Sequence, residues 1–461
     1  MNRSLLFLLT LGVWGLSACD KQLENINPQA SLDIEAAITN AANSEVALSG
    51  AYDIVQSANY YGNQLTYFGD LPADNTFQSG TFPSLFEMDN NALLPNNANV
   101  TNAWVSIYNG VNRANNLIEK VPTLTDATLD NVVNGVKGRD RILGEALFLR
   151  GFHYFTLVRY WGGVPLVLSP TKGISEASRV SRNTEAEVYA QVIKDLTQAE
   201  GLLPVTYANA IELRGRATKA TAQALLSRAY LYTKQWKDAA DKAALVIANT
   251  NYRLLPSYAA IFTTKNTSES VWELQFNPTD QNGVTFHYLA APQGRRENAP
   301  ATALLNAYDP LDQRLAASVA KTGAAALTQA NAYVSKYNRA STQDDPVFLI
   351  RIAEVILNRA EALAEQSYPS AEALVLLNQV RARAGLPALT TTELATLANF
   401  RLAMEKERQL EFAFEGHRWS DLRRTGRAAE VLKLTDPNRL LFPIPERERN
   451  ANPNITQNPG Y

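Results

Sequence analysis

The chain has 461 residues, of which 46% are hydrophobic and 19% are charged, so it is long and apolar enough to bury a large core. Lys and Arg total 43 and Asp and Glu total 45, and this balance argues against a nucleic-acid-binding face or electrostatic docking on anionic lipid. A single cysteine excludes a disulfide framework, and three histidines leave few ligands for a zinc site.

Residues 1–18 have the pattern of a targeting segment. Arg3 gives a positive start, and residues 5–16 form an apolar stretch that is too short to span a membrane, which takes about twenty helical residues. Small residues then lead to Cys19, and this end resembles the lipobox of bacterial lipoproteins. The resemblance implies that Cys19 is acylated and becomes the mature N-terminus, with an ordinary signal peptide as the alternative. We expect residues 19–32, which are polar, to form a flexible leash.

Apolar residues at helical spacing predict a single, mainly α body over residues 33–461. The clearest stripes cover residues 142–152, 188–203, 217–233, 236–247, 349–363 and 373–384. Short turns at Lys234-Gln235 and at residues 366–370 join the last four stripes into two pairs, and small alanines at facing positions favour a tetratricopeptide-like helical repeat. Because a long stretch separates the pairs, the repeat is predicted to be interrupted, and a generic helical bundle is the alternative.

Two stretches break the helical pattern, at about residues 58–100 and 250–347. In the second stretch Trp272, Leu274 and Phe276 alternate with polar residues, which predicts a strand. Both stretches are long and rich in aromatic residues, and long loops mounted on a rigid frame often carry function. The sequence therefore predicts a helical scaffold that presents irregular ligand-binding segments.

Three glutamates in the C-terminal block, at about residues 348–461, recur every four positions. Glu407, Glu411 and Glu415 therefore share one helix face. Their expected ion-pair partners are the nearby Arg408, Arg418, Arg423 and Arg424. Gly416 is expected to take a left-handed conformation and end the helix, with His417 beside the exposed carbonyl groups. A hydrolytic acid/base pair with His417 is the alternative, but such a pair needs carboxylates that face each other across a cleft.

Several blocks, in order along the chain, carry a family resemblance. They are residues 69–75 (GDLPADN), 150–155 (RGFHYF), 162–166 (GGVPL), 351–362 (RIAEVILNRAEA), 377–387 (LNQVRARAGLP), 407–424 (ERQLEFAFEGHRWSDLRR) and 441–445 (LFPIP). Together with the lipobox, these blocks resemble the SusD/RagB family of outer-membrane lipoproteins, and they extend over most of the mature chain.

The resemblance implies a function. Members of this family are surface lipoproteins that capture a nutrient, commonly an oligosaccharide, and deliver it to a SusC-like TonB-dependent transporter in the outer membrane. It implies a non-enzymatic receptor without a cofactor, although the Asp-rich loops would allow a structural calcium ion. A peptide-binding lipoprotein, a helical-repeat protein-interaction module and a glycosidase are the alternatives.

A glycan site needs exposed aromatic rings flanked by polar side chains, because a sugar ring has an apolar face and a rim of hydroxyls. Residues 59–77, 102–109 and 287–296 offer this mixture. The predicted ligand-binding residues are Tyr60, Tyr61, Tyr67, Asp70, Asp74, Asn75, Tyr288, Arg295 and Arg296. Loop packing is the alternative for the tyrosines, and turn formation is the alternative for the two aspartates. Trp104 and His153 are expected in the core.

Overall fold

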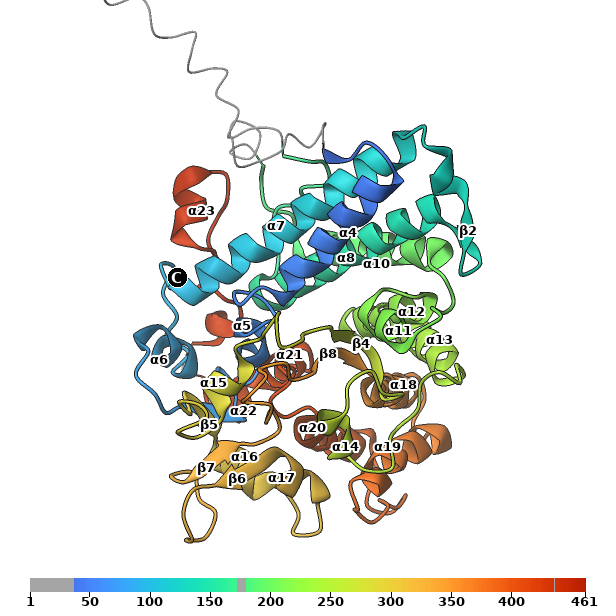
Figure 1. The fold of residues 1–461 in the computed structure, drawn as a ribbon. Helices are drawn as coiled ribbons and strands as arrows, with labels where there is room; N and C mark the ends of the chain where they lie inside the picture. Colours follow the sequence, from blue (N-terminus) through green and yellow to red (C-terminus); the bar gives the residue numbers. More distant parts are fainter. Residues whose placement is uncertain (1–36, 172–179, 435) are drawn as a thin grey trace, which may run out of the picture.

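A computed structural model describes residues 37–171, 180–434 and 436–461. Cys19 and the expected leader and leash therefore lie outside the described residues. The body is mainly α, as predicted, and four long helices pack side by side along one edge of the molecule (Figure 1). They are α4 (Ala41–Gln56), α7 (Ala98–Lys120), α8 (Gly138–Trp161) and α10 (Glu185–Leu202).

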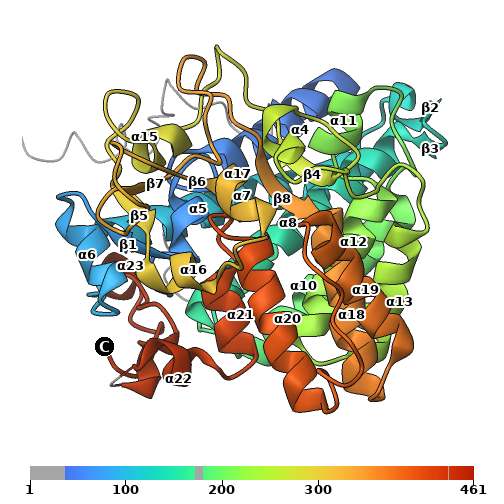
Figure 2. The ribbon, with the colours of Figure 1, turned by 90° about the horizontal axis from the view of Figure 1, so that it is seen from below.

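The two predicted helix pairs are present and adjoin each other. The first pair is α12 (Lys219–Tyr232) with α13 (Trp236–Ile247), and the second is α18 (Ile352–Gln366) with α19 (Ala371–Arg383). Helix α13 packs on α18, so the repeat is interrupted in sequence and continuous in space (Figure 2). The buried side chains between them include Ala239, Ala240 and Ala362, and these small residues let the helices approach closely. The prediction of an interrupted repeat is confirmed.

A two-stranded ladder closes the base of the second irregular stretch. Strand β4 (Ser270–Leu274) contains the predicted Trp272 and pairs antiparallel with β8 (Val347–Arg351). All five residues of each strand are buried, including Glu273, so the expected alternation of buried and exposed side chains is absent. Leu349, which the helical stripe had included, lies in β8 instead because α18 begins at Ile352.

A second ladder joins the two irregular stretches to each other. Strand β1 (Thr76–Gln78) pairs antiparallel with β5 (Asn298–Pro300), which places Phe77 opposite Ala299. The other elements of these stretches are α5 (Gln64–Phe68), α6 (Pro83–Asp89), α14 (Ala260–Thr263), α15 (Val284–Tyr288), α16 (Thr302–Ala307), α17 (Gln313–Ser318), β6 (Val319–Lys321) and β7 (Ala332–Val334). Segments more than two hundred positions apart in the chain thus form one surface region.

Short elements complete the fold. A hairpin of β2 (Val132–Val133) and β3 (Val136–Lys137) precedes α8, and α11 (Ala210–Gly215) precedes α12. The C-terminal block contains α20 (Leu397–Glu411), α21 (Arg418–Arg424), α22 (Ala428–Leu432) and α23 (Glu446–Ala451). The 3-10 turns are η1 (Val121–Thr123), η2 (Ala127–Asp130) and η3 (Pro437–Leu440).

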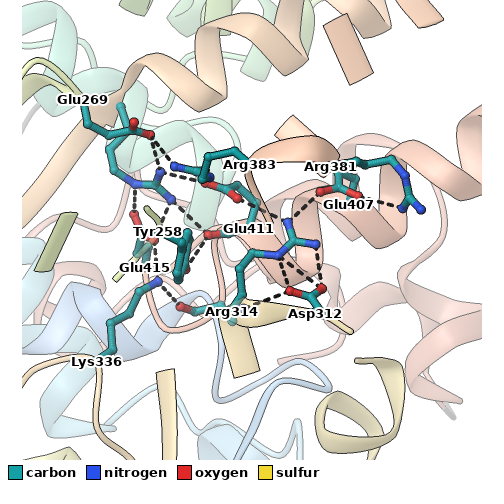
Figure 3. A network of polar contacts seen from close by, with 12 residues as sticks. Tyr258, Glu269, Asp312, Arg314, Lys336, Arg381, Arg383, Glu407, Glu411 and Glu415 are labelled. Carbon is teal, nitrogen blue, oxygen red and sulfur yellow. Dashed lines mark hydrogen bonds and ion pairs between the residues drawn. The ribbon is translucent and has the colours of Figure 1, made fainter. Parts of the chain in front are cut away.

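A buried ion-pair network attaches the second irregular stretch, residues 250–347, to α20 and the turn that follows it (Figure 3). Arg314 of α17 places Nη1 2.6 Å from Glu407 Oε1 and 3.2 Å from Glu411 Oε2. Lys336 donates from Nζ to Glu415 Oε1 at 2.6 Å and to the Ala413 carbonyl at 2.7 Å. Burial alone would raise the pKa of Glu411, but the guanidinium charges of Arg383, Arg351 and Arg314 lower this pKa to about 2. Glu411 is therefore a carboxylate at neutral pH and cannot donate a proton in hydrolysis.

The expected partners of the three glutamates were wrong. Glu407 and Glu411 lie on α20, whereas Glu415 lies beyond its end and does not share their helix face. Arginines from other segments reach all three. The four arginines near them in sequence point elsewhere: Arg408 pairs with Asp421, Arg418 with Asp74, Arg423 with Glu185, and Arg424 with Glu361. Two of these pairs, Arg418 with Asp74 and Arg423 with Glu185, attach the C-terminal block to the N-terminal half of the chain.

The turn after α20 also differs in part from the expectation. Gly416 has the predicted left-handed conformation, with φ of +76°, but α20 already ends at Glu411. His417 stacks on Phe412, with ring centroids 4.7 Å apart, instead of facing exposed carbonyl groups. Burial lowers the pKa of His417 to about 4, so the ring is neutral at pH 7.

Candidate ligand-binding site

Exposed aromatic rings are rare in this protein and lie close together. Of the aromatic side chains in the described ranges, only Phe82, Phe86 and Phe286 are exposed, by 36%, 40% and 43%. Phe82 caps the N-terminus of α6, Phe86 lies one turn further along, and Phe286 belongs to α15. All three come from the irregular stretches and none from the helical repeat.

Arg295 connects the two stretches at this point. Its guanidinium carbon lies 5.2 Å from the centroid of the Phe82 ring and 5.6 Å from that of Phe286. Both distances are within the range of a cation–π contact. We call the surface formed by Phe82, Phe286 and Arg295 the Phe82–Phe286 surface.

A buried carboxylate supports this surface from beneath. Glu297 is 1% exposed, and its Oε1 lies 2.9 Å from Arg295 Nε. The other oxygen accepts hydrogen bonds from Gln78 Nε2 and from the Thr81 amide, both at 3.2 Å. Gly80 leaves room for this carboxylate, because a Cβ atom there would lie 1.5 Å from Glu297 Oε2. The position of Arg295 is therefore determined by β1 and by the loop that follows it.

His287 lies below the two exposed rings. Asn63 Nδ2 is 2.9 Å from His287 Nε2, and the imidazole centroid is 5.3 Å from Tyr67 and 6.4 Å from Phe82. Burial, and then the nearby charge of Arg295, lower the pKa of His287 to about 4. The neutral imidazole thus lies between the buried Tyr67 ring and the exposed Phe82 ring and contacts both.

A hollow of about 690 Å³ opens beside α15. The loop from Leu289 to Gln293 lines one side, and Tyr333, Ser335 and Lys321 contribute to the other. The same loop leads to Arg295, whose amide donates to the Phe286 carbonyl at 2.8 Å. The volume is within the usual range for ligand pockets, and the shared loop joins the hollow to the Phe82–Phe286 surface.

Most of the predicted ligand residues lie in the interior. The exposed fraction is 7% or less for Tyr60, Tyr61, Tyr67, Asp70, Asn75 and Tyr288. Tyr60 Oη lies 3.0 Å from Nδ1 of the buried His153, as expected for a core histidine, and Tyr61 Oη accepts a 2.7 Å hydrogen bond from Arg159. These six side chains offer no surface to a ligand in this structure, because the segments that carry them pack against the helical core.

The polar residues of the first stretch attach it to the C-terminal block. Asp70 accepts hydrogen bonds from the Gly416 amide at 2.8 Å and from Asn75 Nδ2 at 2.6 Å. Asp74 pairs with Arg418 Nε at 2.6 Å. Asp70 and Asp74 therefore have a structural role, because their hydrogen bonds and ion pair connect residues 70–75 to residues 416–418.

The two predicted arginines have different positions. Arg295 lies on the surface, with 48% of its side chain exposed. Arg296 instead donates to the carbonyl groups of Ala332 and Gln329, both at 2.6 Å. Phe82 and Phe286 are not among the residues predicted from the sequence. Phe82 lies between Gly80-Thr81 and Pro83, residue types that favour a turn.

The remaining predicted stretch, residues 102–109, borders a second cavity of about 580 Å³. Trp104 and Tyr108 line it together with Glu448 of α23. Trp104 is only 2% exposed, as expected for a core residue, and Tyr108 donates its hydroxyl to the Pro165 carbonyl at 2.8 Å. This stretch therefore contributes a buried tryptophan and a partly buried tyrosine to the cavity wall.

The described residues lack two kinds of feature. They contain no group of three or more His, Cys, Asp or Glu residues that could hold a metal ion. No helix within residues 37–171, 180–434 and 436–461 has the length and apolar character of a membrane span.

Comparisons with known proteins agree with this architecture. Residues 326–461 match the SusD family model, and residues 20–231 match a model described as "Starch-binding associating with outer membrane". The SusD-like protein P2 of Formosa agariphila is 30% identical, and the match covers 94% of this chain and 95% of that protein. A solved laminarin binding SusD-like protein is 26% identical, with a TM-score of 0.77, over 92% of this chain and all (100%) of that one. A putative sugar binding protein of Bacteroides vulgatus is 27% identical, with a TM-score of 0.76, over 92% and 99%.

Proposed function

This chain belongs to the SusD family, and on that premise we propose that it binds a glycan, without altering it, at the Phe82–Phe286 surface. One observation carries the proposal: the exposed aromatic rings of the described chain belong to the two irregular stretches, which lie far apart in the sequence, and Arg295 contacts a ring from each. The family description names starch, and two relatives are named for binding laminarin or sugar.

The chemistry of the surface suits a sugar. A pyranose ring has an apolar C–H face that packs on an aromatic ring, and hydroxyls at its rim that accept hydrogen bonds from a donor such as Arg295. Hydrolysis would need two carboxylates on opposite sides of the scissile bond. Glu297, the carboxylate bonded to Arg295, is buried, and both of its oxygens are engaged. These features support binding.

The position of the rings also favours a glycan over a peptide. A tetratricopeptide-like clamp would line a concave helical groove with polar side chains. Here α13 and α18 bury Ala239, Ala240 and Ala362 against each other, and the exposed rings belong to the two irregular stretches outside the repeat. The geometry therefore supports a receptor whose helical repeat is a scaffold.

The proposal extends to the cell surface. We propose that Cys19 carries a lipid anchor in the outer membrane and that the bound glycan passes to a SusC-like TonB-dependent transporter. The lipobox around Cys19 and the phrase "associating with outer membrane" in the family description support this. A tether would keep the captured ligand at a high effective concentration near its transporter. In a Cys19→Ala variant the protein should leave the membrane fraction, while the wild-type protein stays in it and a β-barrel co-purifies with it.

A binding screen tests the central claim. The purified protein is expected to bind at least one oligosaccharide of a broad panel in isothermal titration calorimetry, and to release no new reducing ends on incubation. Release of reducing ends would show an enzyme, and binding that survives Phe82→Ala and Phe286→Ala unchanged would place the site elsewhere.

A further inference from the structure

The exposed edge of Arg295 is the most distinctive polar feature of the Phe82–Phe286 surface. Nε is engaged by Glu297 at 2.9 Å, and 48% of the side chain is exposed. Within the described part of the chain, the two terminal nitrogens of Arg295 have no hydrogen-bond partner. The guanidinium carbon of Arg295 lies 5.2 Å from the centroid of the Phe82 ring and 5.6 Å from that of Phe286, so both rings contact the guanidinium. A donor group is thus held in a fixed position with its outer edge free.

The loop that carries Arg295 has an excess of positive charge. Arg295 and Arg296 are two guanidinium groups, and Glu297 is one carboxylate, so the segment 295–297 has a formal charge of +2 − 1 = +1. The hydrogen bonds of Arg296 go to the Ala332 and Gln329 carbonyl groups, which carry no formal charge. His287 adds no charge because burial and the charge of Arg295 lower its pKa to about 4.

The only carboxylate that contacts Arg295 in the described structure is inaccessible to ligand. Glu297 is 1% exposed and shares its second oxygen between Gln78 and the Thr81 amide. A ligand at the surface therefore meets a guanidinium edge that only donates hydrogen bonds. Such an edge is most complementary to a group that only accepts them, and the planar guanidinium fork fits a carboxylate or sulfate through two parallel hydrogen bonds.

We propose that the Phe82–Phe286 surface selects glycans that carry an anionic substituent, a carboxylate or a sulfate ester, and that the outer edge of Arg295 binds this group while the two phenylalanine rings pack on the sugar. The inference rests on the proposed function and adds a substrate class to it. Arg295 is thereby a specificity-determining residue, and Glu297 is a positioning residue that acts through it.

The test is a panel in which each neutral oligosaccharide is paired with its uronate and its sulfate-ester counterpart. We expect acidic members to bind about tenfold more tightly than their neutral counterparts, since hydrogen bonds to a charged partner are worth roughly 1.5–3 kcal/mol and this site is half exposed. Preference for the uronate or for the sulfate ester identifies the source of the charge, and either preference supports the proposal.

Substitutions at Arg295 assign the effect. Arg295→Gln should remove the advantage of the acidic glycans, and Arg295→Lys should keep part of it, because an ammonium retains the charge but loses the bidentate fork. Arg449→Gln is the matched control, since Arg449 is exposed on α23 and is not part of the Phe82–Phe286 surface. Raising NaCl from about 50 to 500 mM should weaken the acidic ligands more than the neutral ones, because salt screens exposed charges.

The failures are distinguishable. Neutral glycans that bind as tightly as their acidic counterparts, or an Arg295→Gln variant that weakens both kinds equally, would overturn the anionic selectivity and leave glycan binding in place. A panel with no ligand of either kind would overturn the proposed function, and this inference with it.

Discussion

Removing the Phe286 ring should weaken glycan binding and leave the fold intact. A phenylalanine side chain presents about 200 Å² in all, so the 43% exposure of Phe286 corresponds to roughly 85 Å² that a sugar can cover. At about 25 cal/mol per Å² the full area is worth ~2 kcal/mol, and half of it ~1 kcal/mol. Phe286→Ala should therefore raise Kd roughly 5- to 30-fold.

The cost to stability comes from the part of the ring that is already buried. By the same coefficient this part, roughly 115 Å², is worth about 3 kcal/mol, and the cation–π contact to Arg295 at 5.6 Å adds about 0.5–1 kcal/mol. In a chain of this size that loss should lower Tm by only about 3–5 °C, so the variant stays folded at 25 °C. Calorimetric titration with a glycan that binds the wild-type protein, together with thermal unfolding, measures both effects.

The design includes a control and a clear negative result. Leu402→Ala also removes an exposed apolar side chain, 53% exposed on α20, but takes no atom from the Phe82–Phe286 surface, so its Kd should match the wild type. If neither Phe286→Ala nor Phe82→Ala changes Kd, the aromatic surface is not where the glycan packs.

Three further substitutions test the interior. Tyr288→Ala should destabilise the fold by about 3–5 kcal/mol, because Tyr288 is 0% exposed; an unchanged Tm with weaker glycan binding would instead support its original assignment as a ligand residue. Arg351→Met should cost about 3–5 kcal/mol in urea unfolding, since it removes the guanidinium that Glu411 and Glu415 share and leaves this buried network with one positive charge fewer, whereas the exposed Arg401→Met should cost about 1 kcal/mol or less. Burial raises the pKa of Glu273 from its usual 4.5 to about 7, so the folded state binds more protons than the unfolded state between these values, and Glu273 lowers stability as pH rises through that window. Glu273→Gln should therefore raise Tm more at pH 8 than at pH 4.5, and an equal shift at both would argue against a buried charge there.

The sequence predicted the features that depend on local periodicity. The turn at Lys234 between α12 and α13 followed from two stripes of apolar residues and the polar pair between them. The helix pairs were predictable because helical faces must be buried, whatever lies between them in sequence. The stacking of α13 on α18 was not predicted, since about a hundred residues separate the two pairs.

The site was harder to predict because exposure is a property of the whole fold. Tyr60 and Tyr61 lie in a polar, tyrosine-rich segment, which suggested an open loop, yet that segment packs on α8 beside His153. The ion-pair partners failed for a similar reason, since arginines near the glutamates in sequence were preferred to distant ones such as Arg314. Neither error could be corrected without knowing which distant segments meet.

The β4–β8 ladder has a consequence for how such receptors diversify. Residues 275–346 leave the scaffold at Leu274 and return at Val347, two positions that face each other across one pair of strands. Because the two ends of this segment are held together by paired strands, its length can change with only a small change in loop-closure entropy. Its recognition residues can change while the helices stay the same. Exchanging this segment between homologous proteins, together with its β1–β5 seam, is therefore a direct way to transplant ligand preference onto an unchanged helical body.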